Sequence, residues 1–249
     1  MTKPKAIFNW SGGKDSSLAL YKLSQNREYD ISTLVTVVSA RYQRVAQHGV
    51  RLELLEQQTQ AIGLPLHKLI MSDWPTMETY DKMTADALHN FKQRNIHYAV
   101  FGDIFLADLR KYREEKLAQA GFQGIFPLWL IPTEQLAREF LQLGFKAIIV
   151  CVDEKHLDKS FVGRPFDEHF LNDLPQSVDP CGEYGEFHSF VYDGPIFKKP
   201  VSFIPGETVY RKYTPSPRQE SDTGYTCGTN NAHPATGFWY CDLIPTPEP

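Results

Sequence analysis

The stretch Phe8-Asn9-Trp10-Ser11-Gly12-Gly13-Lys14-Asp15-Ser16-Ser17 lies between a β-prone run, residues 6–8, and a helical pattern, residues 18–23. A glycine-rich turn between a strand and a helix brings backbone N–H groups close to a ligand and points the positive end of the helix dipole at it. Three serine hydroxyl groups and the Lys14 ammonium add hydrogen-bond donors and positive charge. The stretch therefore predicts an anion-binding loop suited to phosphate oxygens. The alternative is a turn of the same shape that binds no ligand.

The loop is not a Walker A motif, because Asp15 follows Lys14 and no glycine stands five residues before Gly13. Residues 11–16, Ser-Gly-Gly-Lys-Asp-Ser, instead resemble the PP-loop signature of the ATP pyrophosphatase superfamily. The resemblance implies that ATP is cleaved between its α- and β-phosphates while a substrate is adenylated and pyrophosphate is held in the loop. It implies a catalytic role for Lys14 and nucleotide binding by Ser11, Gly12, Gly13, Lys14, Asp15, Ser16 and Ser17.

Length and composition describe an ordinary globular chain of 249 residues, suited to one large domain or a domain with an appendage. A net charge of −4 gives no general attraction to a nucleic-acid backbone, so nucleic acid is not expected as a partner. No apolar run approaches the ~20 residues of a transmembrane helix, and the N-terminus leads at once into a core strand, so no membrane segment and no signal peptide are expected. The four cysteines occur singly, which argues against a zinc ribbon and favours the cytoplasm.

Strand-like and helix-like patterns alternate over residues 5–150. Strands are predicted after the first one at 31–38, 64–71, 97–101 and 146–152, and helices at 48–62, 77–94, 106–120 and 133–143. This alternation predicts an α/β fold with a mostly parallel sheet and helices on both faces. Ligands of such sheets lie beyond the carboxyl ends of the strands. The Ser11 loop, residues 41–48 and Gly102-Asp103 are therefore expected to face one crevice.

The pattern changes after about residue 152. Glu183 and Glu186 lie three residues apart in a glycine-containing loop that leads into an alternating strand, which is typical of a site loop. From Pro205 onward the chain holds seven of its 17 prolines, so we expect an extended, irregular tail, part of which docks on the body. We therefore predict a nucleotide-binding domain at 1–152, a C-terminal substrate domain at 153–204 and a Pro-rich extension at 205–249.

Three further stretches narrow the resemblance: Gly102-Asp103-Ile104 with Arg110 and Arg113 downstream, Pro127-Leu128-Trp129, and residues 181–188 (Cys-Gly-Glu-Tyr-Gly-Glu-Phe-His) followed by 193–197 (Asp-Gly-Pro-Ile-Phe). Together with the PP-loop they are similar to the diphthine–ammonia ligase family over residues 5–204, and segment 41–51 and the tail resemble bacterial members. The resemblance implies a HUP-type, Rossmann-like domain and a smaller α+β domain that closes over the substrate. Where archaeal and eukaryotic members tend to read Glu-Thr, this chain has His188-Ser189.

The family reaction activates a carboxylate with ATP as an acyl-adenylate, which ammonia attacks to leave an amide and AMP. We therefore expect ATP and Mg²⁺ as cofactors. The expected substrates are the carboxylate of a small molecule or modified residue, and ammonia or an amine. A homodimer is one possible oligomeric state. Adenylation brings two anions together, so the site must neutralise charge. Asp15 or Asp103 are candidates to hold Mg²⁺, although Asp15 could instead cap its helix.

Gly102 and Arg113 are candidate nucleotide-binding residues, and Asp103 is also a candidate catalytic residue. Arg113 and Arg110 lie on one helical face, where a solvated surface is the alternative. Glu183 and Glu186 are candidate catalytic residues, because a carboxylate can steer an ammonium ion and accept its proton. Their alternative is a polar turn between strands.

Rival interpretations stay open at this stage. A PP-loop enzyme could modify tRNA by thiolation or lysidine formation, although four scattered cysteines offer no obvious thiolation set. A non-catalytic adenine-nucleotide-binding protein is another. Cys181 could be a nucleophile if His188 served as its base, and His48 and Arg51 could lie at the edge of the site.

Overall fold

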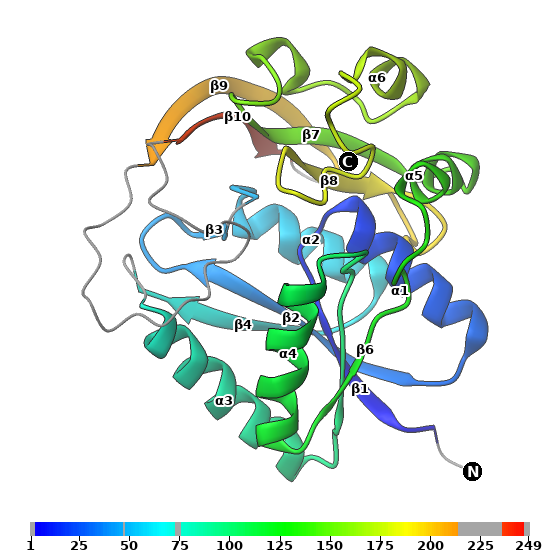
Figure 1. The fold of residues 1–249 in the computed structure, drawn as a ribbon, viewed down its shortest axis with the longest axis vertical. Helices are drawn as coiled ribbons and strands as arrows, with labels where there is room; N and C mark the ends of the chain where they lie inside the picture. The colour runs from blue at the N-terminus through cyan, green and yellow to red at the C-terminus, as the bar shows by residue number, and fades with distance from the viewer. Residues whose placement is uncertain (1–2, 47, 73–75, 214–235, 247–249) are drawn as a thin grey trace.

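The structure is a computed structural model that describes residues 3–46, 48–72, 76–213 and 236–246 (Figure 1). Its first sheet is mainly parallel. Strand β2 pairs with β1 along one edge and with β4 along the other, β5 and β6 follow β1, and β3 pairs antiparallel with the end of β2. The strands are β1 (Lys5–Asn9), β2 (Asp30–Ser39), β3 (Arg44–Val45), β4 (Leu66–Met71), β5 (Tyr98–Val100) and β6 (Gln123–Ile125).

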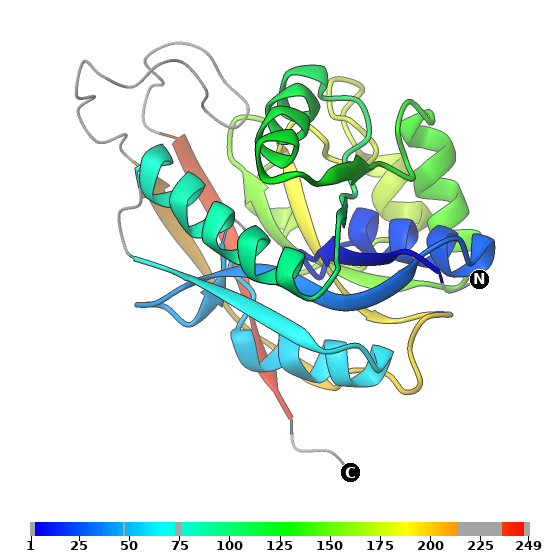
Figure 2. The same cartoon turned by 90° about the horizontal axis from the view of Figure 1, so that it is seen from below.

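The helices of this part cover both faces of the parallel sheet, as the alternating pattern predicts. They are α1 (Lys14–Asn26), α2 (Leu52–Ile62), α3 (Met77–Gln93) and α4 (Ala107–Ala120). Successive residues of β1 enter different cores: Ala6 and Phe8 pack with side chains of α1 and α2, whereas Ile7 packs with those of α3 and α4. Figure 2 shows α3 and α2 on opposite sides of β4. The predicted α/β fold is confirmed.

One predicted helix begins later than expected. The sequence pattern extends from residue 48 to residue 62, but α2 begins at Leu52. Residues before it form a tight loop, in which the Val45 N–H donates to the Val50 carbonyl at 2.8 Å and the Leu52 N–H donates to the Gln43 carbonyl at 2.9 Å. These bonds replace the first helical turn, so His48 belongs to a loop.

A second, antiparallel sheet follows, with the order β8-β7-β10-β9. The strand predicted at 146–152 was expected in the parallel sheet, and that prediction is wrong, because β7 (Lys146–Asp153) pairs antiparallel with β8 (Phe187–Asp193) and β10. The short strand β6 takes the place beside β5 instead. Three-residue strands such as β6 are too short to show a period in the sequence. The division of the chain at residue 152 stays a prediction.

The C-terminal segment contributes a long pair of strands to the second sheet, so the irregular structure predicted from Pro205 onward is wrong for residues 205–213 and 236–245. Strand β9 (Phe203–Tyr213) pairs with β10 (Thr236–Pro245), and β10 also pairs with β7, so that both strands arch across the top of Figure 1. Residues 214–235, which contain much of the predicted Pro-rich extension, lie outside the described residues. The remaining elements are α5 (Thr133–Gln142), the 3₁₀ turn η1 (Lys159–Phe161) and α6 (Glu168–Asp173). None of the described helices combines the length and apolar character needed to span a bilayer.

Candidate active site

The PP-loop connects β1 to α1 and adopts a backbone that only glycine allows without strain. Gly12 has a φ of +78°, and a Cβ at that position would lie 2.8 Å from Leu55 Cδ1. The Ser11 hydroxyl accepts a hydrogen bond from the Gly13 N–H at 3.2 Å and shares another with the Ser16 hydroxyl at 3.0 Å. The loop is therefore ordered by its own serines, and α1 begins immediately after it at Lys14.

Strand β8 of the second sheet lies directly on this loop. The Lys14 N–H donates to Ser189 Oγ at 3.2 Å, and the Val191 N–H donates to the Gly12 carbonyl at 2.9 Å. The buried Gln58 amide bonds both the Gly12 and the Val191 carbonyls, at 3.0 and 2.6 Å. The two sheets are thus joined at the PP-loop. The sequence alone does not reveal that Gln58 and Ser189 support the PP-loop, because each lies more than 40 residues from the loop in the chain.

Lys14 is 4% exposed, and its ammonium group carries the positive charge at the centre of the site. It contacts the Asp15 carboxylate at 2.8 Å and the Cys181 carbonyl, and it lies 5.2 Å from the centroid of the Phe187 ring. Burial lowers the pKa of Lys14, but the charge and hydrogen bond of Asp15, together with the charges of Cys181 and Glu183, outweigh burial and leave the pKa above its usual value. Lys14 therefore stays charged, and an incoming phosphate would compete with Asp15 for it.

The end of β5 approaches the loop closely, as predicted for Gly102 and Asp103. A Cβ on Gly102 would lie 3.1 Å from the backbone of Asp15, so a larger residue there would press on the PP-loop. Asp103 does not stand free, because its carboxylate pairs with Arg113 Nε at 2.7 Å. The Arg113 guanidinium also lies over the Phe101 ring. Arg113 thus holds Asp103 in place, and its predicted contact with nucleotide stays a prediction.

Arg110, the other basic residue on this helical face, pairs with Glu114 at 2.8 Å. Its guanidinium carbon lies 4.6 Å from the Phe126 ring centroid and 4.5 Å from that of Trp129. Such cation–π contacts hold the side chain along the helix surface. The position of the Arg110 side chain is thus explained by its contacts with Glu114, Phe126 and Trp129.

Glu183 connects the C-terminal loop to the end of β5. Its Oε1 atom accepts hydrogen bonds from the Ile104 N–H at 2.8 Å and the Phe105 N–H at 3.3 Å. Burial and the nearby charges of Asp15 and Asp103 outweigh the two hydrogen bonds and together raise the pKa of Glu183 to about 7. The carboxyl group is therefore poised to exchange a proton near neutral pH.

Glu186, the other predicted carboxylate, orders its own loop. It is 1% exposed, and its two oxygens accept hydrogen bonds from the Asp179 N–H and the Tyr184 N–H, each at 3.0 Å. Both oxygens are engaged with backbone, so the geometry supports a structural role. Its predicted part in catalysis stays a prediction without support from these contacts.

Replacing Glu186 with glutamine is expected to lower the free energy of unfolding by about 1–3 kcal/mol, because the new amide NH₂ would face a buried N–H group. For a chain of this size each kcal/mol lowers the Tm by roughly 2–4 °C. Thermal denaturation measures the effect, with the exposed Glu115→Gln on α4 as the control. An unchanged Tm in Glu186→Gln would contradict the structural role.

Two imidazoles, separated by 140 residues in the chain, meet beside the loop. The ring centroids of His48 and His188 are 4.5 Å apart with an interplanar angle of 33°. The His48 Nδ1 atom lies 3.4 Å from the Ser189 carbonyl. Burial and the charge of Lys14 lower the pKa of His48 to about 4, and burial and His48 lower that of His188 well below its usual range. Both rings are therefore neutral at pH 7.

Cys181 lies beside Lys14, but its thiol points elsewhere and donates to the Thr133 carbonyl at 3.3 Å. Burial raises the pKa of this thiol far above its usual value. The nucleophile hypothesis required His188 beside Cys181, and His188 instead stacks on His48. Cys151, Cys181 and Cys241 are buried and free, and Cys227 lies outside the described residues.

Cys181→Ala is expected to retain turnover within about threefold of the unsubstituted enzyme, because a protonated, buried thiol is a poor nucleophile. Alkylation by iodoacetamide at pH 7 should likewise leave Cys181 unmodified in the folded protein, as peptide mass spectrometry would show. Loss of turnover by Cys181→Ala with an unchanged Tm would reinstate the nucleophile hypothesis.

The carboxylates of the site suit a cation only in combination with other ligands. Across the described ranges, no three His, Cys, Asp or Glu residues are grouped as a complete protein metal site. Mg²⁺ in nucleotide enzymes typically needs only one or two carboxylates, with phosphate oxygens and water completing its shell. Asp15 and Asp103 are both close enough to Glu183 to raise its pKa, and a bound cation would relieve this repulsion.

Comparison with known proteins agrees with the geometry. Family models described as the diphthamide synthase N-terminal and C-terminal domains match residues 4–123 and 132–214. A protein of Danio rerio named diphthine–ammonia ligase is 28% identical over 227 residues, which are 80% of this chain and 86% of that protein. The Homo sapiens and Bos taurus proteins of the same name are each 27% identical over 186 residues, covering 69% of this chain and 68% of theirs.

Among solved structures, the U34-tRNA thiolase NcsA of Methanococcus maripaludis aligns with 58% of this chain and 59% of its own, at a TM-score of 0.37 and 15% identity. A likeness this low carries no argument about function. The two family models together cover most of the chain. The chain therefore belongs to the diphthine–ammonia ligase family, the ATP-dependent, amide-forming ligases of the PP-loop superfamily.

Proposed function

We propose that this ligase is of the ATP pyrophosphatase type and acts in two steps. The substrate carboxylate attacks the α-phosphorus of ATP, forms an acyl-adenylate and releases pyrophosphate. Ammonia then attacks the acyl carbon, so that an amide and AMP leave and one proton is released. The observation that carries the proposal is the junction of the PP-loop with the Glu183 loop through Lys14, which contacts both Asp15 and the Cys181 carbonyl.

The residues of the loop would hold the departing pyrophosphate. Lys14 neutralises phosphate charge from a site that water does not reach freely, where electrostatic interactions are strong. The serines and the first N–H groups of α1 supply further donors. Glu183, with its pKa near 7, would accept the proton that ammonia loses. Asp103 would act through charge and position, held by Arg113.

Mg²⁺ fits this site as an ion bound by one or two carboxylates together with phosphate oxygens. Asp15 or Asp103 would hold it together with phosphate oxygens, and Asp15 would do so once Lys14 turns to the phosphates. When bound, the ion would neutralise charge on the phosphate oxygens and favour in-line attack.

The substrate is proposed to be the carboxylate of a modified residue or a small molecule, with ammonia as the nitrogen source. The names of the related ligases, which join ammonia to diphthine, support this choice. The half-buried His48–His188 pair lies beside the PP-loop and, being neutral, adds no charge to the site.

Incubation with ATP, MgCl₂, ammonium and a panel of carboxylates tests the proposal. Formation of AMP and pyrophosphate in equal amounts, dependent on the carboxylate, is the expected result. ATP–pyrophosphate exchange without ammonium isolates the first step. Release of ADP and phosphate instead would overturn the adenylation mechanism.

A further inference from the structure

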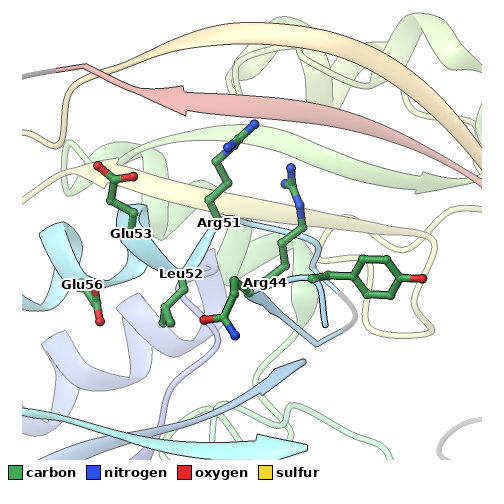
Figure 3. Close-up of a pocket in the computed structure, with 7 residues that line it drawn as sticks. Arg44, Arg51, Leu52, Glu53 and Glu56 are labelled. Carbon is green, nitrogen blue, oxygen red and sulfur yellow. The ribbon is translucent and has the colours of Figure 1, made fainter. Parts of the chain in front are cut away.

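The Asp242 carboxylate links the C-terminal strand β10 to two arginines, Arg44 and Arg51, of the segment that precedes α2. Asp242 accepts hydrogen bonds from Arg51 Nε at 3.1 Å and Arg51 Nη2 at 2.6 Å, and it pairs with Arg44 Nη1 at 2.9 Å. In Figure 3 the guanidinium ends of Arg44 and Arg51 both point toward β10. The Asp242 side chain is 19% exposed. A two-pronged, partly buried pair of this kind is stronger and more directional than an exposed one.

The pKa of Asp242 indicates that its carboxylate stays ionised and paired with the two arginines at neutral pH. Partial burial raises its pKa, but the hydrogen bonds from Arg51 and Arg44 outweigh burial and leave the pKa below its usual value. The pair therefore persists throughout the neutral range.

The two arginines belong to one compact loop, residues 44–46 and 48–51, which β10 contacts a second time. The Arg44 side chain donates to the Gly49 carbonyl at 2.7 Å, and the Val45 N–H donates to the Val50 carbonyl at 2.8 Å. Gly49 has a φ of +70°, and a Cβ there would lie 2.9 Å from the Tyr240 ring. These contacts tie the loop together and place it against Asp242 and Tyr240.

His48 extends from this loop to the PP-loop. Its Cε1 atom lies 3.0 Å from the place that a Cβ on Gly13 would occupy, so the imidazole covers the N-cap glycine just before α1. On its other side the ring stacks on His188 and approaches the Ser189 carbonyl. A chain of direct contacts therefore runs from Asp242 through Arg44 and Arg51 to the phosphate-binding backbone.

We propose that Asp242 is a positioning residue for ATP: through Arg44 and Arg51 it fixes the loop so that His48 covers Gly13 and completes one wall of the nucleotide site. The inference rests on the proposed function, since that function assigns ATP to the PP-loop. Strand β10 would thus contribute to nucleotide binding through Asp242, although Asp242 itself does not contact the PP-loop.

The test measures the equilibrium dissociation constant of the α,β-methylene analogue of ATP by titration calorimetry. Asp242→Ala is expected to raise this constant by about tenfold or more, because small displacements of binding groups have large effects. Asp242→Glu keeps the carboxylate and should restore binding to within about threefold. Tyr210→Phe is the matched control, since it removes a hydrogen bond from β9 to Glu154 of 2.9 Å without touching the loop, and binding should be unchanged.

A double variant tests whether Asp242 acts through His48. Asp242→Ala combined with His48→Ala should weaken binding no further than His48→Ala alone, whereas additive effects would overturn the proposal. An unchanged dissociation constant in Asp242→Ala would also overturn it. Should Asp242→Ala fail to fold, Arg51→Lys keeps the charge, loses the planar fork, and is expected to give an intermediate constant, with unchanged binding counting against the proposal.

Turnover measurements separate this inference from the proposed function. Where a carboxylate substrate is turned over, Asp242→Ala should raise KM for ATP and change kcat by less than about twofold, which a general loss of folding would not do. A protein that binds the ATP analogue but forms no AMP with any carboxylate would refute the proposed function alone, and the binding series would still decide the role of Asp242.

Discussion

Replacing Lys14 with methionine is expected to lower the rate of pyrophosphate release by about 10³-fold, the effect of removing a preorganised charge from a water-poor site. The ammonium of Lys14 is the only cation that the described structure places against both Asp15 and the Cys181 carbonyl. Methionine keeps an unbranched apolar stem and removes only the ammonium group that lies 5.2 Å from the Phe187 ring centroid. The loss should appear in ATP–pyrophosphate exchange, since the lysine acts on the phosphates before ammonia enters.

The control for this variant is Lys22→Ala, on the same helix. Lys22 pairs with Glu139 at 2.5 Å, far along α1 from the loop, so its loss should leave the exchange rate within about twofold. A melting curve for each variant separates lost chemistry from lost folding. Exchange by Lys14→Met at more than about a tenth of the original rate would contradict the role assigned to the lysine.

Replacing Glu183 with glutamine is expected to slow amide formation by about 10²- to 10³-fold, the usual contribution of a positioned base. Adenylate formation should be retained, because the glutamine carbonyl can still accept the N–H bonds of Ile104 and Phe105. ATP–pyrophosphate exchange and amide production, measured side by side, distinguish the two steps. Equal losses in both would show that Glu183 positions the adenylate instead.

The pH dependence of the second step gives a separate test. Burial, with Asp15 and Asp103, raises the pKa of Glu183 to about 7, and a base must be ionised to accept a proton. The rate of amide formation, at a fixed concentration of free ammonia, should therefore rise as pH increases through about 7 and level off above it. Glu183→Gln should lose this inflection, and an inflection retained in that variant would assign it to another group.

Most of the first half of the fold could be predicted because its signals are local. Helices α3, α4 and α5 lie within one or two residues of the predicted ranges, since each has its own apolar period and an end signal such as Gly121. The error at β7 has a different source. A buried apolar strand looks the same in a parallel and an antiparallel sheet, and its partners β8 and β10 are chosen by contacts that a window of sequence does not contain.

The same contrast holds within the site. The sequence by itself determined the PP-loop, because Gly12 and Gly13 permit the turn and a helix start directly after them offers its free N–H groups. It also singled out Glu183. Only the tertiary structure decided that Glu186 serves its own loop, that His48 meets His188, and that Asp242 holds the His48 loop. Backbone preference acts between neighbours in the chain, whereas burial and pairing of charge depend on side chains that up to 191 residues of chain separate.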